Sequence, residues 1–220
     1  MLFSNLQASP TETLVAELRD YPEWHRGRER YGVWIAPVEQ PALLAYIEEA
    51  RHRLGDLLHP CPDRQPHLTV FVCGFHQPTA VHDDDFPPDR LQRQIAWLEA
   101  DIGTPCGLPL ASPDSFATAA FIPVDDPEGR LAQWRTLLGQ ASPEVRQAPY
   151  VPHITLGLYR QRMGADALRQ RLAEMEAPTV TLAISELHYV TYDARHHSGP
   201  LLIRHRAHLV PSGKAMASAS

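Results

Sequence analysis

The stretch Pro66-His67-Leu68-Thr69-Val70 occurs a second time, slightly changed, as Pro152-His153-Ile154-Thr155-Leu156. The two histidines lie 153 − 67 = 86 residues apart. The same offset places Ile35-Ala36-Pro37-Val38 on Phe121-Ile122-Pro123-Val124, so that each proline and valine meets its counterpart. Two separated pairs of segments that share one offset, with no gap between them, indicate an internal duplication.

Each half of the duplication begins with an aliphatic strand, continues with a helix and reaches the strand that carries the His-Thr motif. Because duplicated units tend to pack about a local two-fold axis, as identical subunits do, this order predicts a duplicated, bilobal α+β fold. We expect two lobes of antiparallel sheet with outer helices, and the two motif strands on facing walls of a central cleft. A duplicated lobe could also carry a His-Thr pair with a purely structural role.

Hydrophobic periodicity and turn residues predict the other elements. Strands are expected at residues 31–38, 67–75, 117–124, 152–159, 179–192 and 200–209. Helices are expected at 11–18, capped by Thr11, at 41–57, at 89–102, capped by Asp89, at 127–138 and at 165–175. The predicted organisation is an N-terminal extension over 1–30, loose at residues 1–10, one bilobal domain over 31–210, and a disordered tail over 211–220.

Charge and cysteine content argue against several classes of protein. A net charge of −6 over 220 residues gives no basic field for long duplex nucleic acid, although a local site could bind a small anion or a chain end. Three cysteines without C-x-x-C spacing argue against a disulfide framework and a zinc ribbon. No apolar run is long enough to cross a membrane, and the start of the chain is unlike a signal peptide. We therefore expect a cytoplasmic protein, and a monomer.

Strand alternation predicts which side chains share a face. His67, Thr69 and Phe71 lie on one face of the first motif strand, while the aliphatic residues between them lie on the other. The aliphatic face suits the core, and the His-Thr-Phe face suits the cleft. In the second strand Gly157 takes the place of Phe71, which either leaves room for a ligand or marks a bulge. Phe71 and Tyr150 are candidates to stack on a base, or else to fill the core.

Two histidines and two threonines around one cleft suit phosphodiester chemistry. An imidazole titrates near neutral pH, so one ring can accept a proton while the other donates one. The threonine hydroxyls, about 6–7 Å further along each strand, can donate hydrogen bonds to the non-bridging oxygens of a phosphate. A pseudo-two-fold site matches in-line displacement, because the attacking and leaving oxygens lie on opposite sides of phosphorus. This chemistry requires no metal and no other cofactor.

The motifs His67-Leu68-Thr69-Val70 and His153-Ile154-Thr155-Leu156 resemble the paired H-x-[ST]-aliphatic motifs of the 2H phosphoesterase superfamily, which includes 2′-5′ RNA ligase-like proteins and RNA cyclic phosphodiesterases. The resemblance covers residues 31–209. It implies a bilobal α+β fold and metal-independent action on 2′,3′-cyclic phosphate RNA ends or related cyclic nucleotides, with 2′-5′ ligation as the possible reverse reaction. By direct match, His67, Thr69, His153 and Thr155 would carry the family's roles. Several RNA-processing members have an arginine shortly after the second motif, where this chain has Leu158-Tyr159 and only then Arg160.

Two other functions remain open. The cleft could bind a nucleotide or an RNA 3′ end without turning it over. Alternatively, surplus histidines could serve a metallohydrolase, for example His76 and His82 beside Asp83-Asp84-Asp85, although a solvated acidic loop is the simpler interpretation of that segment. The histidines of the last hairpin, at positions 188, 196, 197, 205 and 208, are interpreted as surface or structural residues.

Overall fold

The structure, a computed structural model, describes residues 2–7, 9–60, 63–146 and 148–210; the tail predicted over 211–220 lies outside this range. The helices of the described residues are α1 (Pro22–His25), α2 (Pro41–Arg53), α3 (Pro88–Asp101), α4 (Arg130–Gly139) and α5 (Ala165–Ala173). Their strands are β1 (Arg30–Pro37), β2 (His67–His76), β3 (Asp85–Phe86), β4 (Cys106–Leu108), β5 (Asp114–Ser115), β6 (Ala119–Pro123), β7 (His153–Leu158), β8 (Leu182–Ile184), β9 (Glu186–Asp193) and β10 (Leu202–His208).

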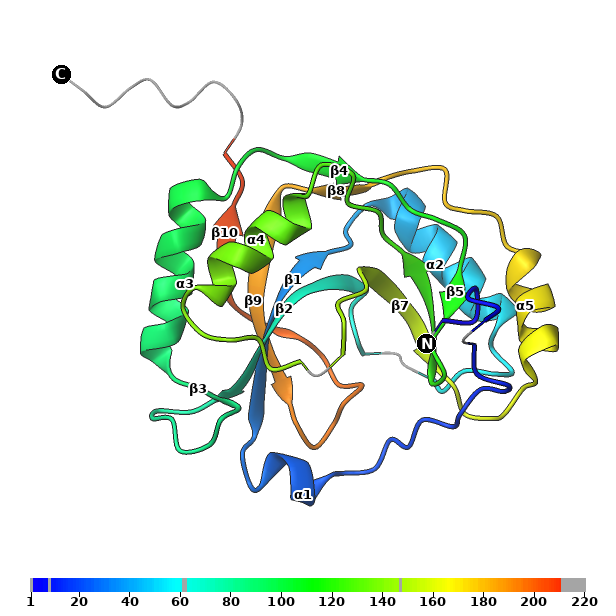
Figure 1. The fold of residues 1–220 in the computed structure, drawn as a ribbon, viewed down its shortest axis with the longest axis horizontal. Coiled ribbons are helices and arrows are strands. Elements are labelled where there is room, and N and C mark those ends of the chain that lie inside the picture. Colours follow the sequence, from blue (N-terminus) through cyan, green and yellow to red (C-terminus); the bar gives the residue numbers. More distant parts are fainter. Residues whose placement is uncertain (1, 8, 61–62, 147, 211–220) are drawn as a thin grey trace.

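Eight strands form the main sheet. Seven of them lie in the order β10-β9-β1-β2-β7-β6-β5, and the eighth, β3, pairs in parallel with the end of β2 (Figure 1). A separate small sheet joins β4 to β8. The predicted α+β fold is therefore confirmed, with one difference. The motif strands β2 and β7 are neighbours that pair antiparallel at Leu68 and Ile154, so the halves meet within a continuous sheet instead of facing each other across a cleft.

The pairing register repeats the offset found in the sequence. In the first half Pro37 pairs with His67 and Ala36 with Leu68. In the second half the residues 86 positions later do the same, since Pro123 pairs with His153 and Ile122 with Ile154. The two halves thus hold their motif strands in the same way, as a duplicated unit should.

A β-bulge is also repeated. Trp34 and Ile35 of β1 pair with Phe71 and Thr69 of β2, which leaves Val70 as an extra residue. Ala120 and Phe121 of β6 pair with Gly157 and Thr155 of β7, which leaves Leu156 as the extra residue. An extra residue reverses the face to which the following side chains point. Strict alternation therefore fails in both motif strands just after the threonine.

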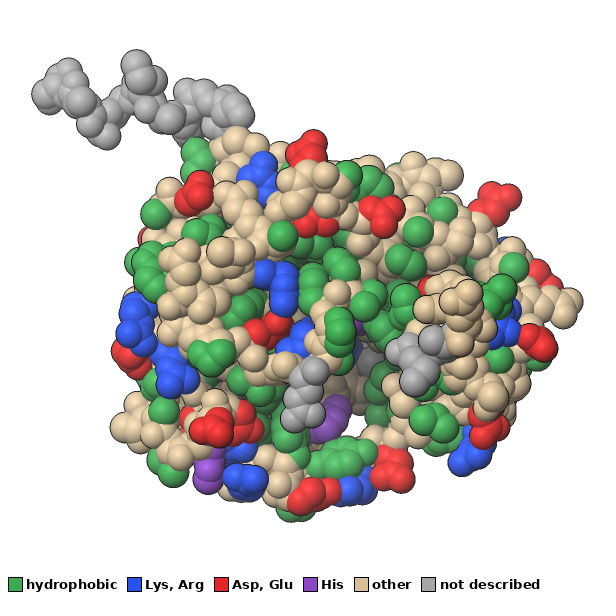
Figure 2. Space-filling model, viewed as in Figure 1, with side chains coloured by type: hydrophobic (Ala, Val, Ile, Leu, Met, Phe, Trp, Pro, Cys, Tyr) green, Lys and Arg blue, Asp and Glu red, His purple; other side chains and the backbone are tan. Residues whose placement is uncertain are grey.

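The segment before β1 crosses from one half of the molecule to the other. Figure 1 shows the blue chain passing from near α5 to α1, and Figure 2 shows the surface hollowed above it. The helix predicted at 11–18 is absent, because backbone groups of Thr13, Leu14 and Ala16 bond to Met163, Ala117 and Tyr159 instead. The start of the chain is not loose either, since Phe3 is fully buried and its N–H bonds to Ser115.

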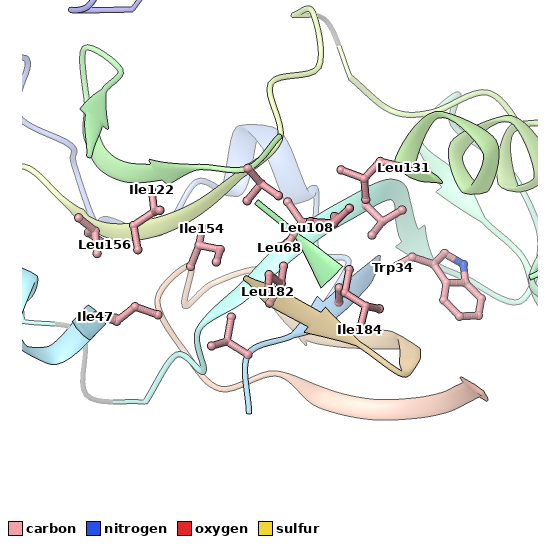
Figure 3. Packing of buried hydrophobic residues seen from close by; sticks show 14 of the residues in the cluster. Trp34, Ile47, Leu68, Leu108, Ile122, Leu131, Ile154, Leu156, Leu182 and Ile184 are labelled. Carbon is pink, nitrogen blue, oxygen red and sulfur yellow. The ribbon is translucent and has the colours of Figure 1, made fainter. Parts of the chain in front are cut away.

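A single large apolar cluster joins the two halves. It contains Leu68 and Ile154 from the seam, the place where β2 pairs with β7, together with Ile47 from α2 and Leu131 from α4. Figure 3 shows these residues converging on a common layer. The helical spacing of Leu43, Ile47 and Ala50 explains why α2 presents one apolar side to the sheet. Helices α2, α3, α4 and α5 contribute buried residues to this cluster and therefore lie on the face opposite the motif histidines, whereas Trp24 of the short helix α1 packs on the other face.

Three other expectations need correction. The acidic loop is not simply solvated, because Asp85 is buried in β3 and pairs with Arg28 at 2.7 Å. Pro87, not Asp89, precedes the first residue of α3, and Asp89 pairs with Arg93 one turn on. The strand predicted at 179–192 is broken at Ser185 into β8 and β9.

In the described part of the chain, no helix has the length and apolar character needed to span a membrane.

Candidate active site

The two His-Thr pairs lie together on the sheet face opposite α2, α3, α4 and α5. Leu68 and Ile154, the directly paired residues of the seam, are fully buried on the other face. Opposite residues of an antiparallel pair share a face, so their neighbours in both strands point the other way. All four motif side chains line one cavity of about 340 Å³. This volume is at the lower end of the range for small-ligand sites, about 300–1,000 Å³.

The antiparallel seam arranges the four groups as two mixed pairs. Leu68 faces Ile154, so the register brings His67 alongside Thr155 and Thr69 alongside His153. Each imidazole thus neighbours the hydroxyl of the other motif, and the two imidazoles lie on a diagonal. A phosphate between the diagonal rings would have one hydroxyl on either side.

Both imidazoles are oriented by the same backbone contact. Nδ1 of His67 donates to the carbonyl of Gln65 at 2.7 Å, and Nδ1 of His153 donates to the carbonyl of Val151 at 2.7 Å. A carbonyl can only accept, so Nδ1 carries the proton in each ring, and Nε2 of the neutral ring keeps its lone pair. Phe116 and Phe121 also hold the His153 ring edge-on, with centroids at 5.0 and 5.3 Å.

Burial keeps both rings neutral. It lowers the pKa of His67 to about 4, an effect that Arg64 and His153 reinforce and the bond to Gln65 opposes. Burial also lowers the pKa of His153, with the Val151 carbonyl opposing and Arg146 reinforcing the shift. Both imidazoles are therefore uncharged at neutral pH in the free protein.

The charged residues that line the cavity favour the binding of an anion. Arg51, Arg64 and Arg146 line it, and none of the lining residues that the structure describes is an aspartate or a glutamate. Arg51 is fixed by a bond from Nε to the Leu156 carbonyl at 2.9 Å, and Arg146 by a bond from Nε to Glu144 at 3.2 Å. Within a chain of net charge −6, this is a local positive site.

Neither aromatic candidate lines the cavity. Phe71 is 2 % exposed and belongs to the main apolar cluster, because the bulge at Val70 turns it towards the helices. Val72 takes its place at the cavity wall. We therefore withdraw Phe71 as a base-stacking residue.

Tyr150 contacts the backbone of the first motif strand and does not line the cavity. Its hydroxyl donates to the Thr69 carbonyl at 2.9 Å, and the Arg135 guanidinium lies 3.7 Å from its ring centre. It therefore joins the second half to the first motif strand, and it is not placed to stack on a base in this cavity. Gly157 follows the bulge of β7 and also lines the cavity, and an added Cβ there would lie 2.9 Å from Leu58 Cδ1. The glycine therefore makes room for core packing.

Sequence reasoning missed several lining residues. Arg64 and Arg146 stand in the loops that lead to the motif strands, so their proximity to His67 and His153 along the chain was an available signal. Tyr192 and His197 come from the β9–β10 hairpin, and Leu18 from the N-terminal segment. Nothing local in the sequence marks these three. No group of three or more potential metal ligands occurs among the described residues.

A duplicated sheet with two His-x-Thr motifs across its seam defines a phosphoesterase of the two-histidine class, as the motif resemblance implied. The chain belongs to the 2′-5′ RNA ligase superfamily, whose model matches residues 38–196. This assignment confirms the resemblance to the 2H phosphoesterases and supports phosphodiesterase or ligase-like activity in general terms.

Solved structures agree on the fold. E. coli LigT in its apo form has a TM-score of 0.55 and 15% identity, over 84% of this chain and 99% of that one. E. coli LigT complexed with 3′-AMP gives 0.54 and 16%, over 83% and 99%. A conserved protein of unknown function from Agrobacterium tumefaciens gives 0.54 and 14%, over 80% and 86%. A search of curated protein sequences returned no match.

Proposed function

We propose that this protein is a metal-independent phosphodiesterase that opens 2′,3′-cyclic phosphates at RNA ends or on related cyclic nucleotides. The observation that carries the proposal is the matched orientation of His67 and His153, each fixed through Nδ1 so that Nε2 remains for the substrate. Two such rings on a diagonal suit a reaction that removes a proton on one side of phosphorus and delivers one on the other.

The reaction follows from this arrangement. One imidazole accepts a proton from water as its oxygen forms a bond to phosphorus. The bond from phosphorus to the 2′ or 3′ oxygen breaks in line, and the other imidazole, protonated, gives its proton to that leaving oxygen. The product is a phosphomonoester with one free hydroxyl. With a ribose 5′-hydroxyl in place of water, and with the bond from phosphorus to the 3′ oxygen as the one that breaks, the same displacement forms a 2′-5′ phosphodiester, which is ligation.

The acid must be charged before the chemical step, although both rings are neutral in the free protein. A bound phosphate anion within hydrogen-bonding distance favours the imidazolium form and raises the pKa of the ring that it contacts. Substrate binding would thereby supply the charged acid, while the ring further from the negative oxygens stays neutral as the base.

The remaining lining groups would stabilise the charge that develops on phosphorus. Thr69 and Thr155 can each donate a hydroxyl hydrogen to a non-bridging oxygen. The guanidinium groups of Arg64 and Arg146 lie in the same cavity and remain charged throughout. The proposal therefore needs no cation to balance the phosphate.

The test is single replacement of each histidine. His67→Ala and His153→Ala should each lower kcat for 2′,3′-cyclic AMP by about 10²–10⁴-fold, the usual contribution of a positioned acid or base. His52→Ala, an exposed histidine of α2 outside the cavity, should leave kcat unchanged. Circular dichroism would establish that all three variants fold. Full activity in both motif variants would end the proposal.

A binding module without turnover is the second candidate, favoured by the carboxylate-free lining with its three arginines. Such a site would bind a cyclic nucleotide whether or not it hydrolysed it. Calorimetry with 2′,3′-cyclic AMP, followed by analysis of the mixture after long incubation, separates the two. Tight binding with no phosphomonoester product would favour the binding module.

A further inference from the structure

The segment ahead of β1 supplies one wall of the catalytic cavity. Leu18 is the single described lining residue that precedes Tyr31. The family match begins only at residue 38, so this wall lies outside the part of the chain that the superfamily model describes. We call residues 16–21 the strap.

The strap is fixed at both ends by residues that also line the cavity. At one end the Ala16 N–H donates to the Tyr159 carbonyl at 2.8 Å, and Nε2 of His59 donates to the Ala16 carbonyl at 2.9 Å. At the other end the Tyr21 ring stacks on His197 with centroids 5.2 Å apart. His59 and His197 both line the cavity. The strap therefore spans the cavity between two anchored points.

Leu18 lies between these anchors with an apolar side chain that has little cover. It is 37 % exposed although it lines a cavity, and neither core cluster of the described residues includes it. Much of the remaining lining is also apolar, including Tyr31, Leu158 and Tyr192. The phosphate-binding groups lie at the motif strands, so the apolar walls are left for the uncharged part of a substrate.

A nucleobase fits this description. It is flat and apolar on its faces, and proteins commonly hold an unpaired base between apolar or aromatic side chains. We propose that the strap is a substrate-binding wall, in which Leu18 packs against the nucleobase of the substrate. This inference rests on the proposed function, because it assumes a nucleotide in the cavity.

The residue just before the strap provides a matched control. Val15 is an exposed aliphatic residue, 43 % exposed, just before the strap, and it does not line the cavity. Leu18→Ala and Val15→Ala therefore remove similar exposed apolar surface, one inside and one outside the site. Neither residue belongs to the buried core, so both variants should fold as the wild type does.

The experiment compares kcat and KM for two substrates, 2′,3′-cyclic AMP and the base-free methyl riboside 2′,3′-cyclic phosphate. Leu18→Ala should raise KM for cyclic AMP by about tenfold, which corresponds to losing most of the apolar contact of a leucine side chain. Its kcat should stay within about twofold, because Leu18 takes no part in proton transfer. For the base-free substrate, and for Val15→Ala on both substrates, no change is expected.

Two results would overturn the inference. One is an unchanged KM for cyclic AMP in Leu18→Ala. The other is an equal rise in KM on both substrates, which would mean that the strap closes the site without touching the base. If the wild type turns over neither substrate, the proposed function fails separately. The same comparison of variants by calorimetry, with 3′-AMP against inorganic phosphate, then decides the role of Leu18 without any turnover.

Discussion

Gln65 connects the orientation of a motif histidine to a distant hairpin. Its carbonyl accepts the Nδ1–H of His67, while its side-chain amide makes two bonds to the backbone of Leu201, from Nε2 at 3.2 Å and to Oε1 at 2.8 Å. We predict that Gln65→Ala frees the loop before β2 and lets the His67 ring shift. A shift of about 1 Å in a reacting group can cost about a hundredfold in rate. We expect kcat to fall by between about tenfold and a hundredfold.

The same change has a cost in stability that can be measured separately. Losing two neutral hydrogen bonds at the surface should lower the free energy of unfolding by about 1–2 kcal/mol. Gln40 offers the control, because its amide makes the same kind of double bridge, to the Thr181 carbonyl at 2.8 Å and the Ala183 N–H at 3.0 Å. Gln40 does not line the catalytic cavity. Gln40→Ala should therefore show a similar loss of stability with kcat unchanged.

Urea denaturation and steady-state kinetics on 2′,3′-cyclic AMP give both quantities for each variant. A positioning role predicts that Gln65→Ala loses kcat, with KM changed little, and that its pH profile shifts because the bond to His67 is altered. If Gln65→Ala kept the wild-type kcat and profile while losing the same stability as Gln40→Ala, the amide bridge would have only a structural role, and the coupling of the hairpin to His67 would be refuted.

Three further predictions concern pH, metal and the core. Because burial lowers the pKa of His67 from about 6.5 to about 4, the fold favours the neutral ring, so its contribution is complete above about pH 6.5 and is lost as the pH falls towards 4. His67→Gln should therefore show a shallower fall in urea midpoint between pH 7 and pH 4, and a fall parallel to that of the wild type would contradict this. Treatment with a chelator should leave hydrolysis of cyclic AMP unchanged, whereas a loss restored by one divalent metal would favour a metallohydrolase. Phe71→Leu should lower the free energy of unfolding by about 1–2 kcal/mol, as core truncations do, without changing KM for cyclic AMP; a raised KM with intact stability would return Phe71 to the binding site.

The repeat made the centre of the site predictable. A common offset for two pairs of segments implied that His67 and His153 occupy equivalent places, and the registers of β1–β2 and β6–β7 repeat that offset. The α+β class and the positions of β1, β2, β6 and β7 followed from the same alignment. Local pattern sufficed here because strand pairing within each half is fixed by the apolar face that it buries.

Other features depend on contacts between distant segments. The bulge at Val70 carries no glycine or proline, so simple alternation placed Phe71 in the cleft, whereas the bulge at Leu156 adjoins Gly157, which the sequence had offered as a bulge marker. The path of residues 11–21 is set by bonds to residues near 117 and 160, which apolar spacing cannot reveal. The arginines of the cavity were likewise found only once the loops before both motifs had been placed.

The seam between the halves has a consequence for how the site is kept in shape. Beyond Leu68 and Ile154 the motif strands part, and each is held by the opposite half: Val145 N–H bonds to the Val72 carbonyl, and 86 positions earlier His59 N–H bonds to the Leu158 carbonyl. The spacing of the imidazoles thus depends on one strand pair, Leu68 with Ile154, and on these two reciprocal loop contacts. Mutations in those loops would therefore change the distance between the two imidazoles without replacing any motif residue.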